Sequence, residues 1–186
     1  LFAEKGRVIL EKAYGVSTLR TRKGDLHADD VFQLSSVSKM FTAEAIMILK
    51  TRGLIDYDAD IRTYIPEFPY EGITTRILLT HRSGPSRYET LADNNWPDKK
   101  QPITNDDMIE YYVKYHPDPY SKPDNAFHYC NVNYALLASI AERVSGKRFV
   151  EFMREDLFDV LGMDDSYIYD MPTDTLVSTY LPGCVQ

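Results

Sequence analysis

Helical periodicity is the feature that most constrains this chain, because apolar residues recur at intervals of three and four through much of its length. The first such stretch, 37–50, predicts a helix that is buried on most sides, with Gly53 where a C-terminal cap belongs. Three further stripes follow the same spacing, in 108–113, 136–144 and 149–161. The pattern therefore predicts a body of packed helices from about residue 37 onward.

A few short strands are expected before these helices. The first residues indicate a β-hairpin, with its turn at Glu4-Lys5-Gly6 and its second strand within 7–14. A polar connection over 17–30 follows, and 31–34 is a candidate short strand. Two or three strands do not make a full sheet by themselves, because small sheets need more strands or a packed layer. We therefore expect the native protein to continue beyond Gln186.

Local signals mark the starts of the shorter elements. Candidate helix starts are Asp58 or Asp60, Thr74 or Thr75, and Thr104 with Asp107. Three prolines within 117–123 predict a rigid extended loop, which leads to His128-Tyr129-Cys130-Asn131 and the next helix.

Composition excludes several classes of protein. The 186 residues carry 21 Lys and Arg against 28 Asp and Glu, a net charge of −7 without a basic block, which argues against nucleic-acid binding. The longest strongly apolar stretches are a few residues, far short of the ~20 that a transmembrane helix needs. Cys130 and Cys184 are too few for a disulfide framework and lack zinc-ligand spacing. No motif implies a metal or an organic cofactor.

The first chemical motif is Ser36-Val37-Ser38-Lys39 at the start of the 37–50 helix. Residues three apart on a helix face the same way, so Lys39 can reach the oxygen of Ser36. A serine needs a base to become nucleophilic, and an amine in an apolar setting can serve as that base. The alternative is that Ser35 or Ser36 merely caps the helix and that Lys39 is a solvated charge.

The second motif is Tyr129-Cys130-Asn131, at the exit of the proline-rich loop. A phenol beside a lysine can relay a proton from a serine to a leaving group, and an asparagine amide can hold both a lysine and a substrate amide. The alternative is that Asn131 caps the following helix while Tyr129 packs in the core. His81 is expected to be a packing or hydrogen-bonding residue behind the loop at Ser83-Gly84.

Together the two motifs resemble the serine β-lactamase and penicillin-binding protein superfamily, in its class C-like and esterase branch. The similarity includes three segments: 32–43 around Ser36, Leu78-Leu79-Thr80-His81-Arg82-Ser83-Gly84, and 127–137 around Tyr129. The resemblance implies an α/β (α+β) fold with an antiparallel sheet flanked by helices and a mainly helical lobe, the sheet being incomplete in this chain.

The resemblance also implies roles for four residues. Ser36 would be the nucleophile, Lys39 its partner, Tyr129 the general base or proton relay, and Asn131 a substrate-orienting residue. The backbone N–H of Ser36 would be one oxyanion donor. The family's third motif, Lys-Thr-Gly or His-x-Gly on a late strand, does not occur in 1–186. We therefore expect this piece alone to be a poor catalyst.

Three domain segments follow from the same reasoning. Residues 1–56 would be the N-terminal part of the α/β domain, 57–165 the mainly helical lobe, and 166–186 an irregular return toward the α/β domain. The expected function is that of a serine hydrolase that forms an acyl-enzyme on a β-lactam, a D-Ala-D-Ala peptide or a small ester. The alternative is a non-catalytic binding or sensor domain for penicillin or peptidoglycan peptides. The bacterial periplasm or cell surface is the expected location, with the cytoplasm as the other possibility.

Overall fold

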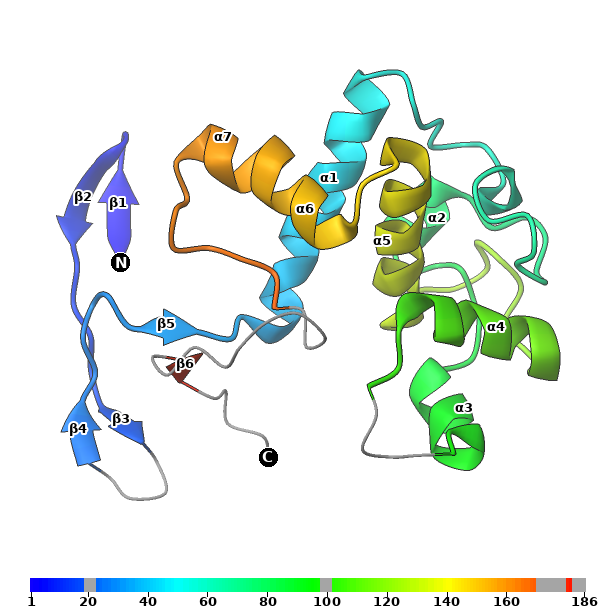
Figure 1. Cartoon of the computed structure of the whole chain (residues 1–186), viewed down its shortest axis with the longest axis horizontal. Helices are drawn as coiled ribbons and strands as arrows, with labels where there is room; N and C mark the ends of the chain where they lie inside the picture. Colours follow the sequence, from blue (N-terminus) through cyan, green and yellow to red (C-terminus); the bar gives the residue numbers. More distant parts are fainter. Residues whose placement is uncertain (19–22, 98–101, 170–179, 182–186) are drawn as a thin grey trace. The chain divides into compact units, whose positions relative to one another are not determined.

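The computed structural model describes residues 1–18, 23–97, 102–169 and 180–181 of the chain (Figure 1). The described residues fall into two compact units. One comprises those up to Val37 together with strand β6, and the other runs from Ser38 to residue 169. The division into the domain segments 1–56, 57–165 and 166–186 stays a prediction.

The described residues of the first unit form short paired strands, which precede the turn at Ser35 except for β6. Its strands are β1 (Phe2–Glu4), β2 (Arg7–Leu10), β3 (Val16–Thr18), β4 (Lys23–Asp25), β5 (Val31–Phe32) and β6 (Tyr180–Leu181). β1 and β2 form the predicted antiparallel hairpin, although β2 ends at Leu10. The polar connection expected over 17–30 is wrong in part, because β3 and β4 form a second antiparallel hairpin there. β5 is the predicted short strand and pairs in parallel with β6.

The second unit is helical, as the apolar periodicity predicts. Its elements are α1 (Lys39–Thr51), the 3₁₀ turn η2 (Ile61–Thr63), α2 (Thr75–Leu79), α3 (Tyr88–Asn95), α4 (Asn105–Tyr115), α5 (Val132–Ser145), α6 (Phe149–Met153), the π-helical turn η3 (Arg154–Phe158) and α7 (Asp159–Leu161). None of the helices in the described part of the chain is long and apolar enough to cross a membrane.

Side-chain caps start three of these elements where the sequence predicts them. The Thr104 hydroxyl accepts from the backbone N–H of Asp107, whose carboxylate accepts from the N–H of Thr104, which is a complete capping box for α4. Asp60 caps η2 and Thr74 caps α2 in the same way, each by accepting from a backbone N–H two or three residues later.

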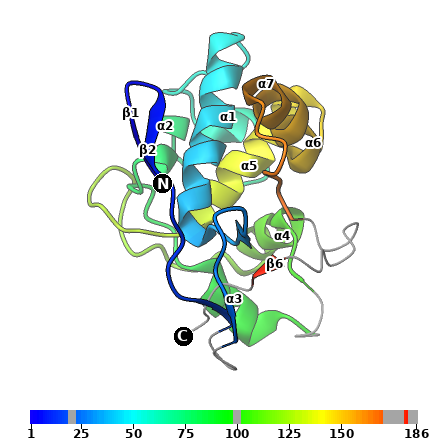
Figure 2. The same ribbon diagram turned by 90° about the vertical axis from the view of Figure 1, so that its left-hand side faces the viewer.

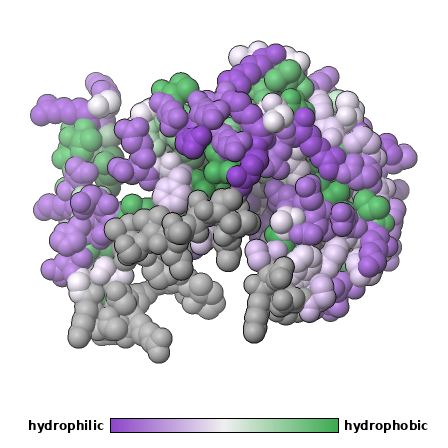
Figure 3. Space-filling view, in the orientation of Figure 1, coloured by the Kyte–Doolittle hydropathy of each residue, from purple (hydrophilic) through white to green (hydrophobic). Residues whose placement is uncertain are grey.

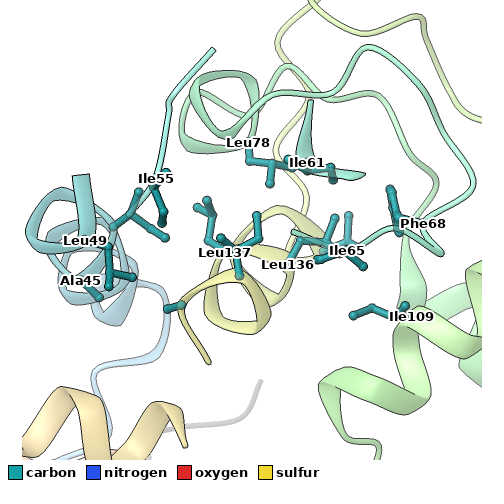
Figure 4. Packing of buried hydrophobic residues seen from close by; sticks show 14 of the residues in the cluster. Ala45, Leu49, Ile55, Ile61, Ile65, Phe68, Leu78, Ile109, Leu136 and Leu137 are labelled. Carbon is teal, nitrogen blue, oxygen red and sulfur yellow. The ribbon is translucent and has the colours of Figure 1, made fainter. Parts of the chain in front are cut away.

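The core of the second unit is apolar and surrounds α5 (Figure 4). Leu136 and Leu137 on α5 are fully buried, and α1 contributes Ala45 and Leu49. Leu78 on α2 packs into the same cluster, as do several residues of the segments that join the helices. Burial of each such leucine contributes about 1.5–3 kcal/mol of transfer free energy, so this cluster is the main source of stability for the helical unit.

Helix α1 is not buried on most sides, which corrects the expectation from its apolar sequence. It packs against α5 and α6 (Figure 2). Met40 and Met47, on other sides of α1, are 65% and 50% exposed. Periodicity gives the apolar character of each face but does not identify which faces find a partner. Apolar side chains accordingly reach the surface among hydrophilic ones (Figure 3).

Candidate active site

Ser36 lies in the 3₁₀ turn η1 (Ser35–Ser38), which leads directly into α1. Its side chain is exposed. The residue at the N-cap position of α1 is Ser38, and its hydroxyl makes no capping hydrogen bond. The α-helix begins at Lys39, and Ser35 and Ser36 lie in the 3₁₀ turn before it.

Lys39 is half-buried and faces groups from a distant part of the chain. Its Nζ donates a hydrogen bond of 3.0 Å to Oδ1 of Asn131, 92 residues later. The same Nζ lies 5.1 Å from the ring centroid of Tyr129 and 5.7 Å from that of Tyr134. An ammonium over aromatic faces is attracted by their negative charge density. Lys39 is thus part of a defined cluster, and the alternative of a simple solvated charge is wrong.

The ring of Tyr129 rests on His81. The two ring centroids are 4.5 Å apart at an angle of 35°, and His81 also lies 5.1 Å from the ring of Tyr134. Burial and then the positive charge of Lys39 lower the pKa of His81, so its imidazole is neutral near pH 7. A neutral ring packs beside the Lys39 ammonium without repulsion. Tyr129 is 41% exposed.

Asn131 precedes α5 and occupies its N-cap position, but its side chain makes no capping hydrogen bond. Instead, Oδ1 accepts from Lys39 and Nδ2 donates a hydrogen bond of 2.8 Å to Oε1 of Glu89. The alternative in which the Asn131 side chain merely caps the helix is therefore wrong. The structure thus brings the Lys39 and Asn131 side chains together, in the contact expected of an asparagine that holds a lysine.

A buried polar network holds the segment that carries Tyr129 and Asn131. The carbonyl of His81 accepts from the backbone N–H of His128 at 2.8 Å. Nδ1 of His81 lies 3.4 Å from the backbone nitrogen of Cys130 and 3.0 Å from Nδ2 of Asn133, which are both donors, so Nδ1 is the acceptor. The Ser83 hydroxyl donates to Oδ1 of Asn133. This confirms the expectation of a hydrogen-bonding His81 behind the Ser83-Gly84 loop.

The proline-rich loop is hydrogen-bonded to the segment 82–84, which follows His81. The carbonyl of Gly84 accepts from the N–H of Tyr120 at 2.9 Å. Arg82 Nε donates to Oδ1 of Asp124 at 2.6 Å, and the N–H of Asp124 donates to the carbonyl of Arg82 at 2.8 Å. Gly84 has a φ of +86°, and a Cβ there would lie 2.1 Å from the carbonyl oxygen of Ser121. Only glycine fits at this close approach.

Sequence reasoning missed three residues that complete this arrangement: Glu89, Asn133 and Tyr134. Glu89 lies on α3, a helix that the sequence analysis did not predict. Asn133 and Tyr134 lie on the first turn of α5 and follow the Tyr129 motif directly. Cys130, between Tyr129 and Asn131, is buried and belongs to the apolar core. Cys184 lies outside the described residues.

The described part of the chain contains no group of three or more His, Cys, Asp or Glu side chains that could hold a metal ion. The polar groups around Lys39 are an ammonium, a phenol, an amide and a carboxylate. This set is suited to moving protons and to orienting a carbonyl compound.

Residues 1–183 match the family model described as Beta-lactamase. The chain belongs to the beta-lactamase family. The family resemblance drawn from the serine and tyrosine motifs is thereby confirmed, and so is the expected fold class, since similar solved structures have the same fold.

Three similar proteins illustrate the range of this family. A penicillin-binding protein of Bacillus subtilis (strain 168) is 32% identical over 170 residues, which cover 91% of this chain and 37% of the relative. The lovastatin esterase of Penicillium rubens is 27% identical, with 92% of this chain and 48% of the esterase covered. The octameric penicillin-binding protein homologue from Pyrococcus abyssi superposes with a TM-score of 0.75 at 28% identity, over 92% of this chain and 41% of that chain. The chain thus spans less than half the length of each.

Proposed function

We propose that the protein is a serine hydrolase that forms an acyl-enzyme through Ser36. The observation that carries the proposal is the hydrogen bond between Lys39 Nζ and Asn131 Oδ1, with the Tyr129 ring beside the same ammonium. Two motifs that are far apart in the sequence meet there in one cluster. The family membership supports the same activity, because the relatives include an esterase and penicillin-binding proteins.

In the proposed reaction, the oxygen of Ser36 attacks the carbonyl carbon of an amide or ester. The bond from Ser36 to that carbon forms as the proton of the hydroxyl passes to Tyr129, which would act as a phenolate general base beside the Lys39 ammonium. The bond to the leaving group then breaks, and the leaving nitrogen or oxygen takes the proton back. Water later cleaves the acyl-enzyme, releases the acid and restores the serine. Asn131 orients the substrate by hydrogen bonding, and the backbone N–H of Ser36 stabilises the oxyanion.

The proposed substrates are β-lactams, D-Ala-D-Ala peptides or small esters. The names of the relatives support this range, since they are penicillin-binding proteins and an esterase. A location in the periplasm or at the cell surface of a bacterium belongs to the same proposal. Apolar-pocket differences between such substrates amount to only ~1–3 kcal/mol, so the choice among them is a matter for direct assay.

The test is intact mass spectrometry after incubation with a penicillin and, separately, with an activated ester. It uses this chain and a form extended to the natural stop codon. We expect an adduct on the extended form that is absent from its Ser36→Ala variant. Because the third family motif is absent from 1–186, the adduct on the shorter chain should form more slowly.

Ser38→Ala is the matched control, because Ser38 stands in the same turn and its hydroxyl makes no cap bond. It should keep the adduct. An adduct that persists in Ser36→Ala would contradict the assignment of the nucleophile. Tight reversible binding of penicillin without any adduct would favour a non-catalytic binding or sensor domain instead.

A further inference from the structure

Glu89 is the partner of Asn131 that the two sequence motifs do not include. It stands in the first turn of α3, where the positive end of the helix dipole favours a carboxylate. Its Oε1 accepts from Asn131 Nδ2 at 2.8 Å. Its Oε2 is buried and has no hydrogen-bond partner among the described residues. Burial and then the charge of Glu89 raise the pKa of the neighbouring Tyr88, because a nearby negative charge disfavours the phenolate.

A buried carboxylate oxygen without a donor is costly, so the position requires an explanation. A purely structural contact to an amide N–H needs only one acceptor oxygen, which a neutral glutamine also has. The feature that a carboxylate supplies, and a glutamine does not, is that it can only accept hydrogen bonds.

This property fixes the orientation of Asn131. The two ends of an asparagine amide have nearly the same shape, and the amide can turn over unless its partners distinguish them. On one side Lys39 can only donate, and on the other side Glu89 can only accept. Only one orientation satisfies both, with Oδ1 toward Lys39 and Nδ2 toward Glu89.

We propose that Glu89 is a positioning residue that locks the Asn131 amide in this orientation and thereby sets its second Nδ2–H as the donor for a substrate carbonyl. Nδ2 carries two hydrogens, and Glu89 occupies one. The role of the other rests on the proposed function, in which Asn131 orients the substrate. The orientation itself does not depend on that function and is testable without a substrate.

The experiment reverses the polarity of the pair. Asn131→Asp places a second carboxylate against Glu89, so two acceptors face each other. In the double variant Asn131→Asp with Glu89→Gln, the glutamine amide can donate to the new carboxylate, whose other oxygen still accepts from Lys39. If the contact is the one described, the double variant is less impaired than Asn131→Asp alone, whereas independent sites would give additive losses.

Two readouts on the full chain separate this inference from the proposed function. Thermal unfolding needs no activity, and we expect Asn131→Asp to lower Tm by about 4–8 °C and the second substitution to restore at least half of that loss. Acylation by an activated ester, followed on the extended form, should fall about 100-fold in Asn131→Asp and recover about tenfold in the double variant. Glu110→Gln, at an exposed glutamate of α4, is the control and should change neither.

Additive losses in both readouts would overturn the inference. Recovery of Tm without recovery of acylation would overturn the positioning role and leave a structural contact. If the unsubstituted protein forms no adduct, the proposed function fails, and the Tm values of the single and double variants alone test the orientation of Asn131.

If Asn131→Asp does not fold, the single variants Glu89→Ala and Glu89→Gln test the positioning role. We expect Glu89→Ala to raise KM for the ester more than it lowers kcat. Glu89→Gln keeps one acceptor oxygen but its amide can turn over, so its acylation rate should lie between those of Glu89→Ala and the unsubstituted protein. Equal rates for the two variants would refute the role.

Discussion

Replacement of Gly84 by alanine tests how the loop that carries Tyr129 is held. Gly84 has a φ of +86°, and its carbonyl accepts from the N–H of Tyr120. A Cβ at this position would lie 2.1 Å from the carbonyl oxygen of Ser121 and 2.9 Å from its carbonyl carbon. These are backbone atoms, so no side-chain rotation relieves the clash.

The expected loss has two parts. An alanine in the left-handed region costs about 1–2 kcal/mol. Ser121 must also retreat by about 1.3 Å to reach ordinary contact, and such overpacking costs about 1–3 kcal/mol. We therefore expect Gly84→Ala to lower the free energy of unfolding by about 2–5 kcal/mol, a large share of the 5–15 kcal/mol that is usual for a domain.

Gly146→Ala separates the two parts. Gly146 also has a positive φ, of +70°, but a Cβ there meets no atom within 4 Å. It should therefore lose only the conformational part, about 1–2 kcal/mol. Urea unfolding followed by the fluorescence of Trp96, the one tryptophan of the chain, measures both variants. If Gly84→Ala costs no more than Gly146→Ala, the close approach at Ser121 is wrong.

Two further predictions concern buried polar contacts in the helical unit. Tyr112 is fully buried, and Tyr112→Phe removes the hydroxyl that donates to the part-buried carbonyl of Ser86, so it should cost about 1–3 kcal/mol in urea unfolding. Asp156, 12% exposed, accepts from Arg52 and from Lys147, each at 2.7 Å. Burial alone would raise the pKa of Asp156, but hydrogen bonds from Lys147 and Arg52 outweigh it and hold the pKa below its ordinary value. The stability from this lowered pKa is fully present above about pH 4 and is lost as pH falls through the folded-state pKa. Asp156→Asn should therefore cost about 2–3 kcal/mol near neutral pH and flatten the loss of stability below pH 4, and equal acid dependence in both proteins would contradict this assignment.

The helical unit was predictable where local sequence decides the structure. The capping box of Thr104 and Asp107 depends on residues three apart, and so do the caps at Asp60 and Thr74. Leu136, Leu137 and Ile140, which belong to the predicted apolar stripe of α5, are buried. These caps depend little on the rest of the fold, because the interacting groups are neighbours in the chain.

Elements that depend on distant partners were missed or incomplete. The pairing of β5 with β6 joins Val31 to Tyr180, and no local pattern specifies it. Helix α3 has few apolar residues, and only Leu91 and Ala92 among them are buried, so its periodicity is weak. The exposure of Met40 and Met47 on α1 likewise depends on which faces of the helix find partners, which periodicity does not encode.

The same distinction explains which site residues the sequence identified. Lys39 and Asn131 each belong to a short motif whose chemistry is visible in its own residues, and the hydrogen bond between them agrees with both motifs. Glu89 carries no motif, and its contact with Asn131 joins α3 to the residue that precedes α5, 42 positions later in the chain. An amide whose two ends are held by a pure donor and a pure acceptor has one orientation, and that constraint is a property of three elements together. Positioning residues such as Glu89 can therefore be found by asking which hydrogen-bonding group of a motif residue still lacks a partner. Once Lys39 accounts for the oxygen of Asn131, the nitrogen still requires an acceptor, and the structure supplies it from Glu89.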